Sequence, residues 1–271
     1  MESTRREPAV AGTFYPGNAS ALQQDVAKLV QLQEDRHELL ACIAPHAGYV
    51  YSGGVAGELY GHLDVPRRVL VIGPNHTGVG AKVAVAPHER WSTPLGDKVV
   101  DLALVQAIVE ESAAATLDAG AHWREHSLEV QLPFLLARQP DLEFTPLCLG
   151  HLSLDQCLEL GRTLARLILD LGESVGIVAS SDMSHYLTDD EARRLDHLAI
   201  DAALTRDPTT LYKTVHDEGI TMCGVVPATV ALEAANHLGA TNAHLVAYAT
   251  SGDVSGDRSA VVGYAGICIH R

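Results

Sequence analysis

The chain alternates short apolar runs with longer stretches whose apolar residues recur at helical spacing, and this alternation restricts the fold more than any other feature. Leu22, Val26 and Leu29 show the helical spacing. Residues 68–72 and 175–179 form nearly continuous apolar runs of strand length instead. Strands that alternate with helices are typical of an α/β fold, in which helices cover both faces of a central sheet.

Seven strands are predicted, at residues 39–44, 68–72, 82–86, 142–149, 175–179, 244–249 and 260–269. Helices are predicted from Asn18 or Ser20 onward, at 99–110, 153–171 and 188–204, and from near Cys223. The last two strands follow each other closely, so we expect them to run antiparallel. The sequence contains no internal repeat, low-complexity tract or obvious linker. We therefore expect a single domain over residues 1–271, built as a three-layer α/β/α sandwich with a mixed, mostly parallel sheet.

Charge limits the partners of the chain. Its 19 Lys and Arg stand against 34 Asp and Glu, which gives a formal net charge of −15. Nucleic acids and anionic membranes bind proteins largely through Lys and Arg, and no basic run offsets the negative charge here. A membrane-spanning helix needs about 18 or more apolar residues in a row, and the apolar runs of this sequence are far shorter. We expect neither a nucleic-acid nor a membrane partner.

The cysteines and the N-terminal segment bear on the cellular compartment. Five cysteines occur, an odd number, and no C-x-x-C pair is present. Arg5 and Arg6 faintly resemble a twin-arginine export signal, but the apolar stretch of about 7–15 residues that such a signal requires does not follow. A chain of 271 residues also does not need disulfides to fold. These features predict a cytoplasmic protein.

Polar loops that carry a histidine follow three of the predicted strands. His46, His76 and His185 each lie just beyond a strand end, and Asp182 lies three residues before His185. In open α/β sheets, ligands bind beyond the carboxyl ends of the strands. Neutral imidazole is a common ligand for iron, copper and zinc. One histidine in such a loop carries little information, but three in one chain favour a convergent site.

Cys223 is the candidate for an anionic third ligand. It lies just ahead of a predicted helix, and a helix N-terminus lowers the pKa of a thiol, whose thiolate is both nucleophile and metal ligand. We therefore expect Cys223 to be the most easily oxidised or alkylated thiol. The alternative interpretation is a small buried residue with a packing role. That packing role is assigned to the other four cysteines: Cys42, Cys148, Cys157 and Cys268.

Two further polar segments have competing interpretations. His126 and Glu129 are three residues apart and would share one face of a helix, whereas Ser127 would serve equally well as a helix N-cap, so a site role and a structural role are both open for His126. Residues 252–257 contain a serine among glycines, but they lack the strand–G-x-S-x-G–helix context of a nucleophile. They are interpreted as a turn between the last two strands.

In its motifs the chain strongly resembles the Memo family, whose prokaryotic members are called AmmeMemoRadiSam system protein B. The matching motifs are spread in order over nearly the whole sequence, at residues 6–16, 44–49, 73–76, 125–129, 181–186 and 223–224. The resemblance implies a fold similar to that of class III extradiol ring-cleaving dioxygenases, which are non-haem Fe(II) enzymes. It also implies a pathway link to an AMMECR-type protein and a radical SAM enzyme.

The same resemblance implies a metal site and the residues that form it. His46 and His76 stand at the two histidine-ligand positions, and Cys223 stands at the third, where the dioxygenases carry a carboxylate. His185 and Asp182 would line the pocket, and His126 would border it. The implied cofactor is a single transition-metal ion, Fe(II) or copper, with zinc as a further option, because a thiolate is a softer ligand than a carboxylate.

Two classes of function follow from these residues. The first is a metal-dependent oxidoreductase of unknown substrate, in which His185 is the general base or acid, Asp182 orients it and His126 assists. The second is a non-enzymatic protein that binds copper or iron, or an adaptor that binds a small molecule or a peptide. A hydrolase with a zinc-bound water would use the same residues.

Overall fold

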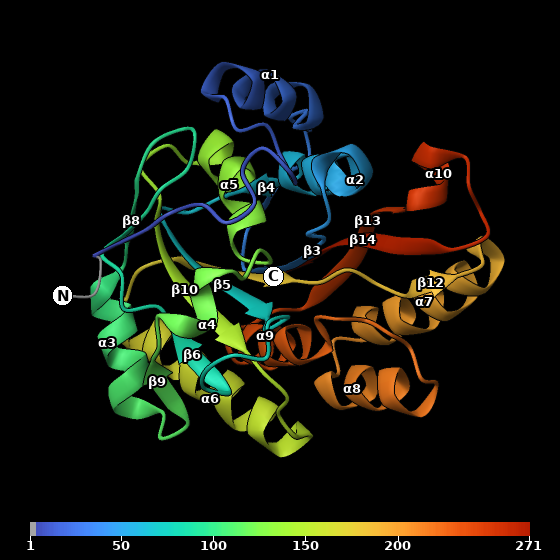
Figure 1. The fold of residues 1–271 in the computed structure, drawn as a ribbon. Helices are drawn as coiled ribbons and strands as arrows, with labels where there is room; N and C mark the ends of the chain where they lie inside the picture. Colours follow the sequence, from blue (N-terminus) through green and yellow to red (C-terminus); the bar gives the residue numbers. More distant parts are fainter. Residues whose placement is uncertain (1–3) are drawn as a thin grey trace.

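Strands and helices alternate along most of the computed structural model, which describes residues 4–271 (Figure 1). The strands are β1 (Arg5–Arg6), β2 (His37–Glu38), β3 (Ala41–Ala44), β4 (Leu63–Asp64), β5 (Arg68–Pro74), β6 (Val83–Val85), β7 (Arg90–Trp91), β8 (Lys98–Val100), β9 (Ala115–Leu117), β10 (Glu143–Leu149), β11 (Val175–Ser180), β12 (His185–Leu187), β13 (Asn242–Thr250) and β14 (Val261–His270). The helices are α1 (Ala19–Leu29), α2 (Tyr49–Gly61), α3 (Leu102–Glu111), α4 (Gly120–Trp123), the 3-10 helix η1 (Glu129–Gln131), α5 (Leu132–Arg138), α6 (Leu154–Leu171), α7 (Asp189–Leu204), α8 (Pro208–Asp217), α9 (Val225–His237) and α10 (Ser251–Ser255).

Parallel strands form the centre of the large sheet, in the order β8–β10–β5–β11–β3. β14 adds to this group antiparallel to β3, and β13 pairs antiparallel with β14. Almost every residue of β5 and all of β11 are buried, as expected for inner strands whose two faces are both covered. The predicted α/β class with a mixed, mostly parallel sheet is therefore confirmed, including the antiparallel final pair.

Helices cover both faces of this sheet. α2 packs on β13 and β14, and α1 and α5 pack beside it, so these three helices form the layer at the top of Figure 1. α9 contacts β11, β3 and β5, and α6 and α8 pack against α9 in the layer at the bottom of the same view. Within residues 4–271, no helix is both long enough and apolar enough to cross a membrane.

Two predicted elements are wrong in detail. Residues 98–100 form strand β8 and not the start of a helix, because they pair with β10 and β7. The side chain of Asp101 then accepts a hydrogen bond from the Leu104 N–H, which sets the first turn of α3. The predicted turn at 252–257 is largely helix α10. Thr250 and Asp253 form a capping box that starts this short helix, and Gly256, at φ 79°, ends it.

Helix α2 has no helical apolar pattern in the sequence, because four of its 13 residues are glycines. Two of these glycines lie against the backbone at the end of α1 and just after it. A side chain at Gly57 would overlap the carbonyl oxygen of Leu29, and a side chain at Gly61 would overlap that of Gln31. The two chain segments thus touch backbone to backbone. This contact fixes the position of α2, which begins three residues after His46.

Gly57→Ala is expected to lower the free energy of unfolding by about 1–3 kcal/mol, because the added methyl group must push the two segments apart. Gly54→Ala is the matched control, since Gly54 is on the same helix and nothing lies within 4 Å of an added Cβ. Alanine there is expected to raise the free energy of unfolding by up to about 1 kcal/mol through helix propensity. Chemical denaturation measures both values. Equal effects of the two substitutions would contradict the proposed contact.

Candidate metal centre

The candidate site lies where three neighbouring parallel strands end. β5, β11 and β3 are adjacent and run in the same direction, so the loops after them meet at one edge of the sheet. The loop after β3 carries His46, the loop after β5 carries His76, and the loop after β11 carries Asp182. Helix α9 begins at the same edge, and Cys223 lies two residues before its first residue, Val225. The structure thus brings together the residues that the sequence pointed to.

Donor atoms of His46, His76 and Cys223 all lie within 4.8 Å of one another. Nε2 of His46 is 3.3 Å from Sγ of Cys223. The rings of His46 and His76 lie 5.1 Å apart and meet edge to face, at 79°. His46 is buried, whereas 32% of the side-chain surface of His76 is exposed. The group therefore opens to solvent on the His76 side.

Ser180 fixes which nitrogen of His46 carries the proton. The Ser180 hydroxyl donates to the backbone oxygen of Ser127 at 2.7 Å, so its oxygen must accept from Nδ1 of His46, which is 2.8 Å away. Nε2 of His46 is then unprotonated and faces Cys223. Gln131 donates to the same Ser180 oxygen at 2.9 Å and fixes the hydroxyl from the other side. Burial also lowers the pKa of His46 well below the ordinary value, which favours the neutral ring.

Glu125 fixes the proton of His76 on Nδ1 in the same way. Its carboxylate accepts hydrogen bonds from Nδ1 of His76 at 2.9 Å, from the His76 N–H at 2.6 Å, and from the N–H groups of His126 and Ser127. Burial alone would raise the pKa of Glu125, but the hydrogen bond and charge of His76 outweigh it and hold the pKa at about 2. Through these hydrogen bonds Glu125 orients His76, and with His76 and His126 it also forms a second group of side chains close enough to hold an ion.

The surroundings of Cys223 contradict one expectation. A lowered thiol pKa was predicted from the helix N-terminus, but burial of the sulfur and the nearby charge of Asp182 raise the pKa of Cys223 instead. The Asp182 N–H donates to the sulfur at 3.2 Å. A side chain at Gly224 would overlap the backbone of Ser180, so glycine lets α9 start this close to β11. The ready oxidation of Cys223 remains a prediction, now without support from a low thiol pKa.

Asp182 and His185 occupy the site edge in roles that differ from those expected. The predicted orientation of His185 by Asp182 is wrong, because Nδ1 of His185 lies 3.0 Å from the carbonyl oxygen of Thr221 and the His185 N–H donates to Oγ1 of Thr221. Asp182 instead accepts the backbone N–H of His46 at 2.7 Å and so fixes the loop after β3. Burial raises the pKa of Asp182 to about 7.

His126 lies directly beside the two candidate ligands. Its ring stacks on His76 at 4.5 Å and lies 5.4 Å from the ring of His46. The expected helix face shared with Glu129 is wrong, because His126 precedes η1 and Glu129 is turned into the core, where it pairs with Arg6 at 2.7 Å. The expected N-cap role of Ser127 is also wrong, since its hydroxyl donates to the backbone oxygen of Pro74.

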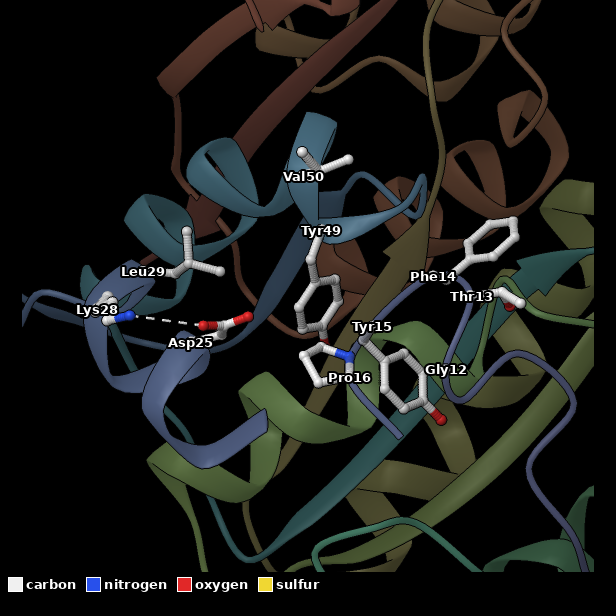
Figure 2. Close-up of a pocket in the computed structure, with 10 residues that line it drawn as sticks. All are labelled: Gly12, Thr13, Phe14, Tyr15, Pro16, Asp25, Lys28, Leu29, Tyr49 and Val50. Atoms are coloured by element: carbon white, nitrogen blue, oxygen red, sulfur yellow. Dashed lines mark ion pairs between the residues drawn. The ribbon is translucent and has the colours of Figure 1, made fainter. Parts of the chain in front are cut away.

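A cavity of about 430 Å³ is lined by the segment around Phe14 and by parts of α1 and α2 (Figure 2). Phe14 contributes to its lining and also packs against His126, with 4.8 Å between the ring centres and the rings tilted at 51°. None of the three candidate metal ligands is among the residues that line it, which are Gly12, Thr13, Phe14, Tyr15, Pro16, Asp25, Lys28, Leu29, Tyr49 and Val50. The cavity therefore adjoins the site through Phe14 and does not contain it.

The donor set fits a single transition-metal ion. Two imidazoles and one thiolate match iron, copper and zinc, and both imidazoles have the Nδ1 hydrogen bond that orients histidine ligands in metal centres. Glu125, Ser180 and Thr221, which hold the histidines in place, were not predicted as site residues. Of the three, only Glu125 lies within a motif that carries the family resemblance. Nothing in the spacing of a serine or a threonine shows which ring it will hold.

Fold and site together define a class of α/β proteins with a His, His, Cys donor set at the carboxyl ends of the central strands. The chain belongs to the Memo family, since the family model for Memo-like proteins matches residues 6–268.

Relatives named MEMO1 family protein occur in Methanosarcina mazei, Archaeoglobus fulgidus and Aquifex aeolicus. They are 42%, 43% and 41% identical to this chain, over 97% of this chain and 98% of each relative. A solved structure of an uncharacterized protein from Escherichia coli K12 is similar, with a TM-score of 0.55 and 15% identity over 85% of this chain and 99% of that one. This last likeness concerns the fold alone.

The pH dependence of stability tests the role of Glu125. Its pKa of about 2 in the folded protein lies below the ordinary glutamate value of 4.5, so its stabilising effect is complete above pH 4.5 and is lost as the pH falls toward 2. Glu125→Gln is therefore expected to cost about 3 kcal/mol at pH 7 and progressively less at lower pH. Denaturation of metal-free protein at several pH values measures this. Glu58→Gln, at an exposed position on α2, is the control. A cost independent of pH would contradict the ionised, hydrogen-bonded Glu125.

Proposed function

We propose that this Memo family protein holds one transition-metal ion between His46, His76 and Cys223 and uses it in redox chemistry on a small molecule. The observation that carries the proposal is the fixed orientation of both imidazoles. Ser180 and Glu125 bind the Nδ1 side of the two rings, which leaves Nε2 of each ring available as a ligand. Histidines that bind metals almost always donate the other ring N–H to a partner of this kind.

Iron or copper is the proposed ion, with zinc as the alternative. A bound ion of this kind supplies Lewis acidity and, for iron or copper, one-electron chemistry. Coordination deprotonates a thiol outright, so metal binding would reverse the effect of burial on Cys223. The exposed side of His76 gives a substrate access to the ion.

His185 is the proposed general base or acid. Nδ1 of its ring lies 3.0 Å from the carbonyl oxygen of Thr221 and must donate to it, because a carbonyl oxygen can only accept. Nε2 of His185 is therefore free to accept a proton, and imidazole is the most frequent general base of enzymes. His126 is proposed to contact the substrate beside His76, and Asp182 to act by positioning the His46 loop.

The competing function is metal binding without catalysis, with copper or iron as the cargo or a peptide as the ligand. The observation that favours it is the chemistry of Cys223, because a thiolate suits soft Cu(I) and is itself oxidisable. The hydrogen bonds to His185 favour the enzyme instead, since His185 is not part of the donor set and a storage site has no use for it.

Residence in the cytoplasm and a pathway shared with an AMMECR-type protein and a radical SAM enzyme are parts of the same proposal. They rest on the family resemblance. The similarity to extradiol dioxygenases also makes a catechol with Fe(II) and oxygen the natural first assay. We expect little ring cleavage there, because Cys223 replaces the hard carboxylate of those enzymes.

Metal analysis of anaerobically purified protein is expected to find one ion per chain in this site. His46→Ala and Cys223→Ser should each abolish its binding, because two protein ligands are too few to hold it against water. Ser180→Ala should weaken binding about 10–100-fold, since it frees the His46 ring without removing a donor. His216→Ala, at an exposed position on α8, is the matched control and should bind as the parent does. Unchanged affinity in both ligand variants would refute the proposed centre.

His185→Ala separates the enzyme from the binding protein. Turnover of a redox substrate is expected to fall by about 100-fold or more, whereas metal affinity should change little, because His185 lies outside the donor set. The measurement is a metal titration and a rate on the same preparation. If His185→Ala equals the parent in every rate assay while His46→Ala loses the metal, the protein binds metal without base catalysis.

A further inference from the structure

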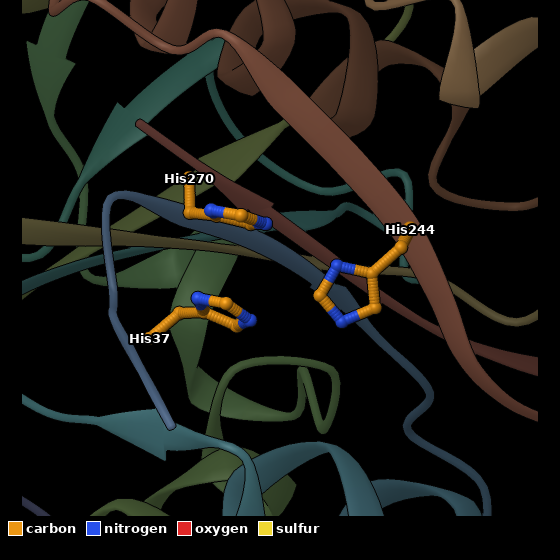
Figure 3. A group of neighbouring side chains, drawn as sticks. All are labelled: His37, His244 and His270. Carbon is orange, nitrogen blue, oxygen red and sulfur yellow. The ribbon is translucent and has the colours of Figure 1, made fainter. Parts of the chain in front are cut away.

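A second group of three histidines lies on another part of the molecule. His37 is in β2, His244 in β13 and His270 at the end of β14 (Figure 3). β14 runs antiparallel to β3, with Ile269 opposite Ala41, so His270 lies beside the start of β3. His46 follows the other end of β3. The two histidine groups are therefore at opposite ends of one central strand and are separate sites.

Strand register explains why these rings meet. His244 pairs with Cys268, so His270, two residues further along β14, is on the same face of the hairpin as His244. His37 reaches this face from β2, which is held in place by its parallel pairing with β4 and by the hydrogen bond from the His37 N–H to the carbonyl of His62.

The three side chains present converging nitrogens. The rings of His37 and His270 stack at 3.8 Å, and His244 lies 5.3 Å from each of them. In Figure 3 the outer edges of the stacked pair face His244. One ring nitrogen from each residue lies within 4.8 Å of the others. Nitrogens that share one ion at bonds of about 2.0–2.1 Å are roughly 3.3 Å apart, so binding requires these half-buried side chains to rotate and the stacked pair to open.

Hydrogen bonding and charge suit a cation. Nδ1 of His270 lies 2.9 Å from the backbone oxygen of Arg271 and donates to it, which leaves Nε2 as the ligand atom. Asp35 interacts electrostatically with both His37 and His244. The net charge of −15 further favours a cation over an anion.

We propose that His37, His244 and His270 form a second metal site, for a divalent ion of the Zn²⁺ class, with water in the fourth position. Three imidazoles without a thiolate suit Zn²⁺, and also Cu²⁺ or Ni²⁺, better than hard Mg²⁺ or soft Cu(I). The ion links β2, which precedes β3 in the chain, to the hairpin of β13 and β14. The site thereby joins segments that are more than 200 residues apart in the chain.

Zn²⁺ titration of the full chain tests this site in a background that lacks the first one, His46→Ala with Cys223→Ser. One Zn²⁺ per chain is expected to bind there and to raise the melting temperature. His244→Gln or His270→Gln in that background should weaken binding by at least about 100-fold and remove the thermal shift. His216→Gln, on the exposed surface of α8, should change neither. Melting curves without metal show whether each variant is folded.

Co²⁺ identifies the donors independently. Co²⁺ at the second site should show a tetrahedral ligand-field spectrum without the thiolate charge-transfer band that a Cys223 site would add. The proposal is overturned if the double-variant background binds no Zn²⁺, or if the His244 and His270 variants bind it as tightly as that background. Neither result bears on the first site, because two of its three ligands are already replaced in every protein in this titration.

Discussion

Parallel pairing of β5, β11 and β3 is the interaction on which the candidate centre depends. Ala179 pairs with both Ile72 and Ile43, and Ser180 with Ala44, so β11 and β3 end together and β5 continues only slightly beyond them, to Pro74. Side chains alternate between the faces of a sheet, and a shift of one residue would turn Ser180 away from His46. The buried apolar residues of these strands fix the register, and the register in turn places the histidine loops.

A buried polar network extends this control into the core. Gln131 donates to the carbonyl of Pro45 and to Ser180, and its own side-chain oxygen accepts from Tyr60. Each of these groups is buried, so breaking one bond leaves an unpaired polar atom that costs about 1–3 kcal/mol. The orientation of His46 is thus coupled to the folding of the whole core. A ligand held so firmly loses little entropy when it binds an ion.

Sequence reasoning predicted the parts of this molecule that depend on periodicity and motif. The strands before His46, His76 and Asp182 were visible as apolar runs, and their shared direction follows from the α/β class. Helix α2 was invisible because its glycines serve close backbone packing and not an apolar face. Thr221 was missed for a different reason. Its bond to His185 joins segments 36 residues apart, and only the folded chain makes them neighbours. The proton positions on the histidines likewise follow from partners that no spacing in the sequence reveals.

The two histidine groups differ in how far the protein prepares them for an ion. At the first, Nδ1 of each ring has a buried hydrogen-bond partner, and one Nε2 already lies 3.3 Å from the sulfur. At the second, within residues 4–271, only the His270 ring has a hydrogen-bond partner, the backbone oxygen of Arg271, and all three rings are half-buried and must rotate. Rotation of side chains into one geometry costs free energy that the preformed group does not lose. A thiolate also attracts a cation more strongly than a third neutral imidazole does. The first centre should therefore fill at the lower metal concentration, and the second should respond only when free metal rises above it.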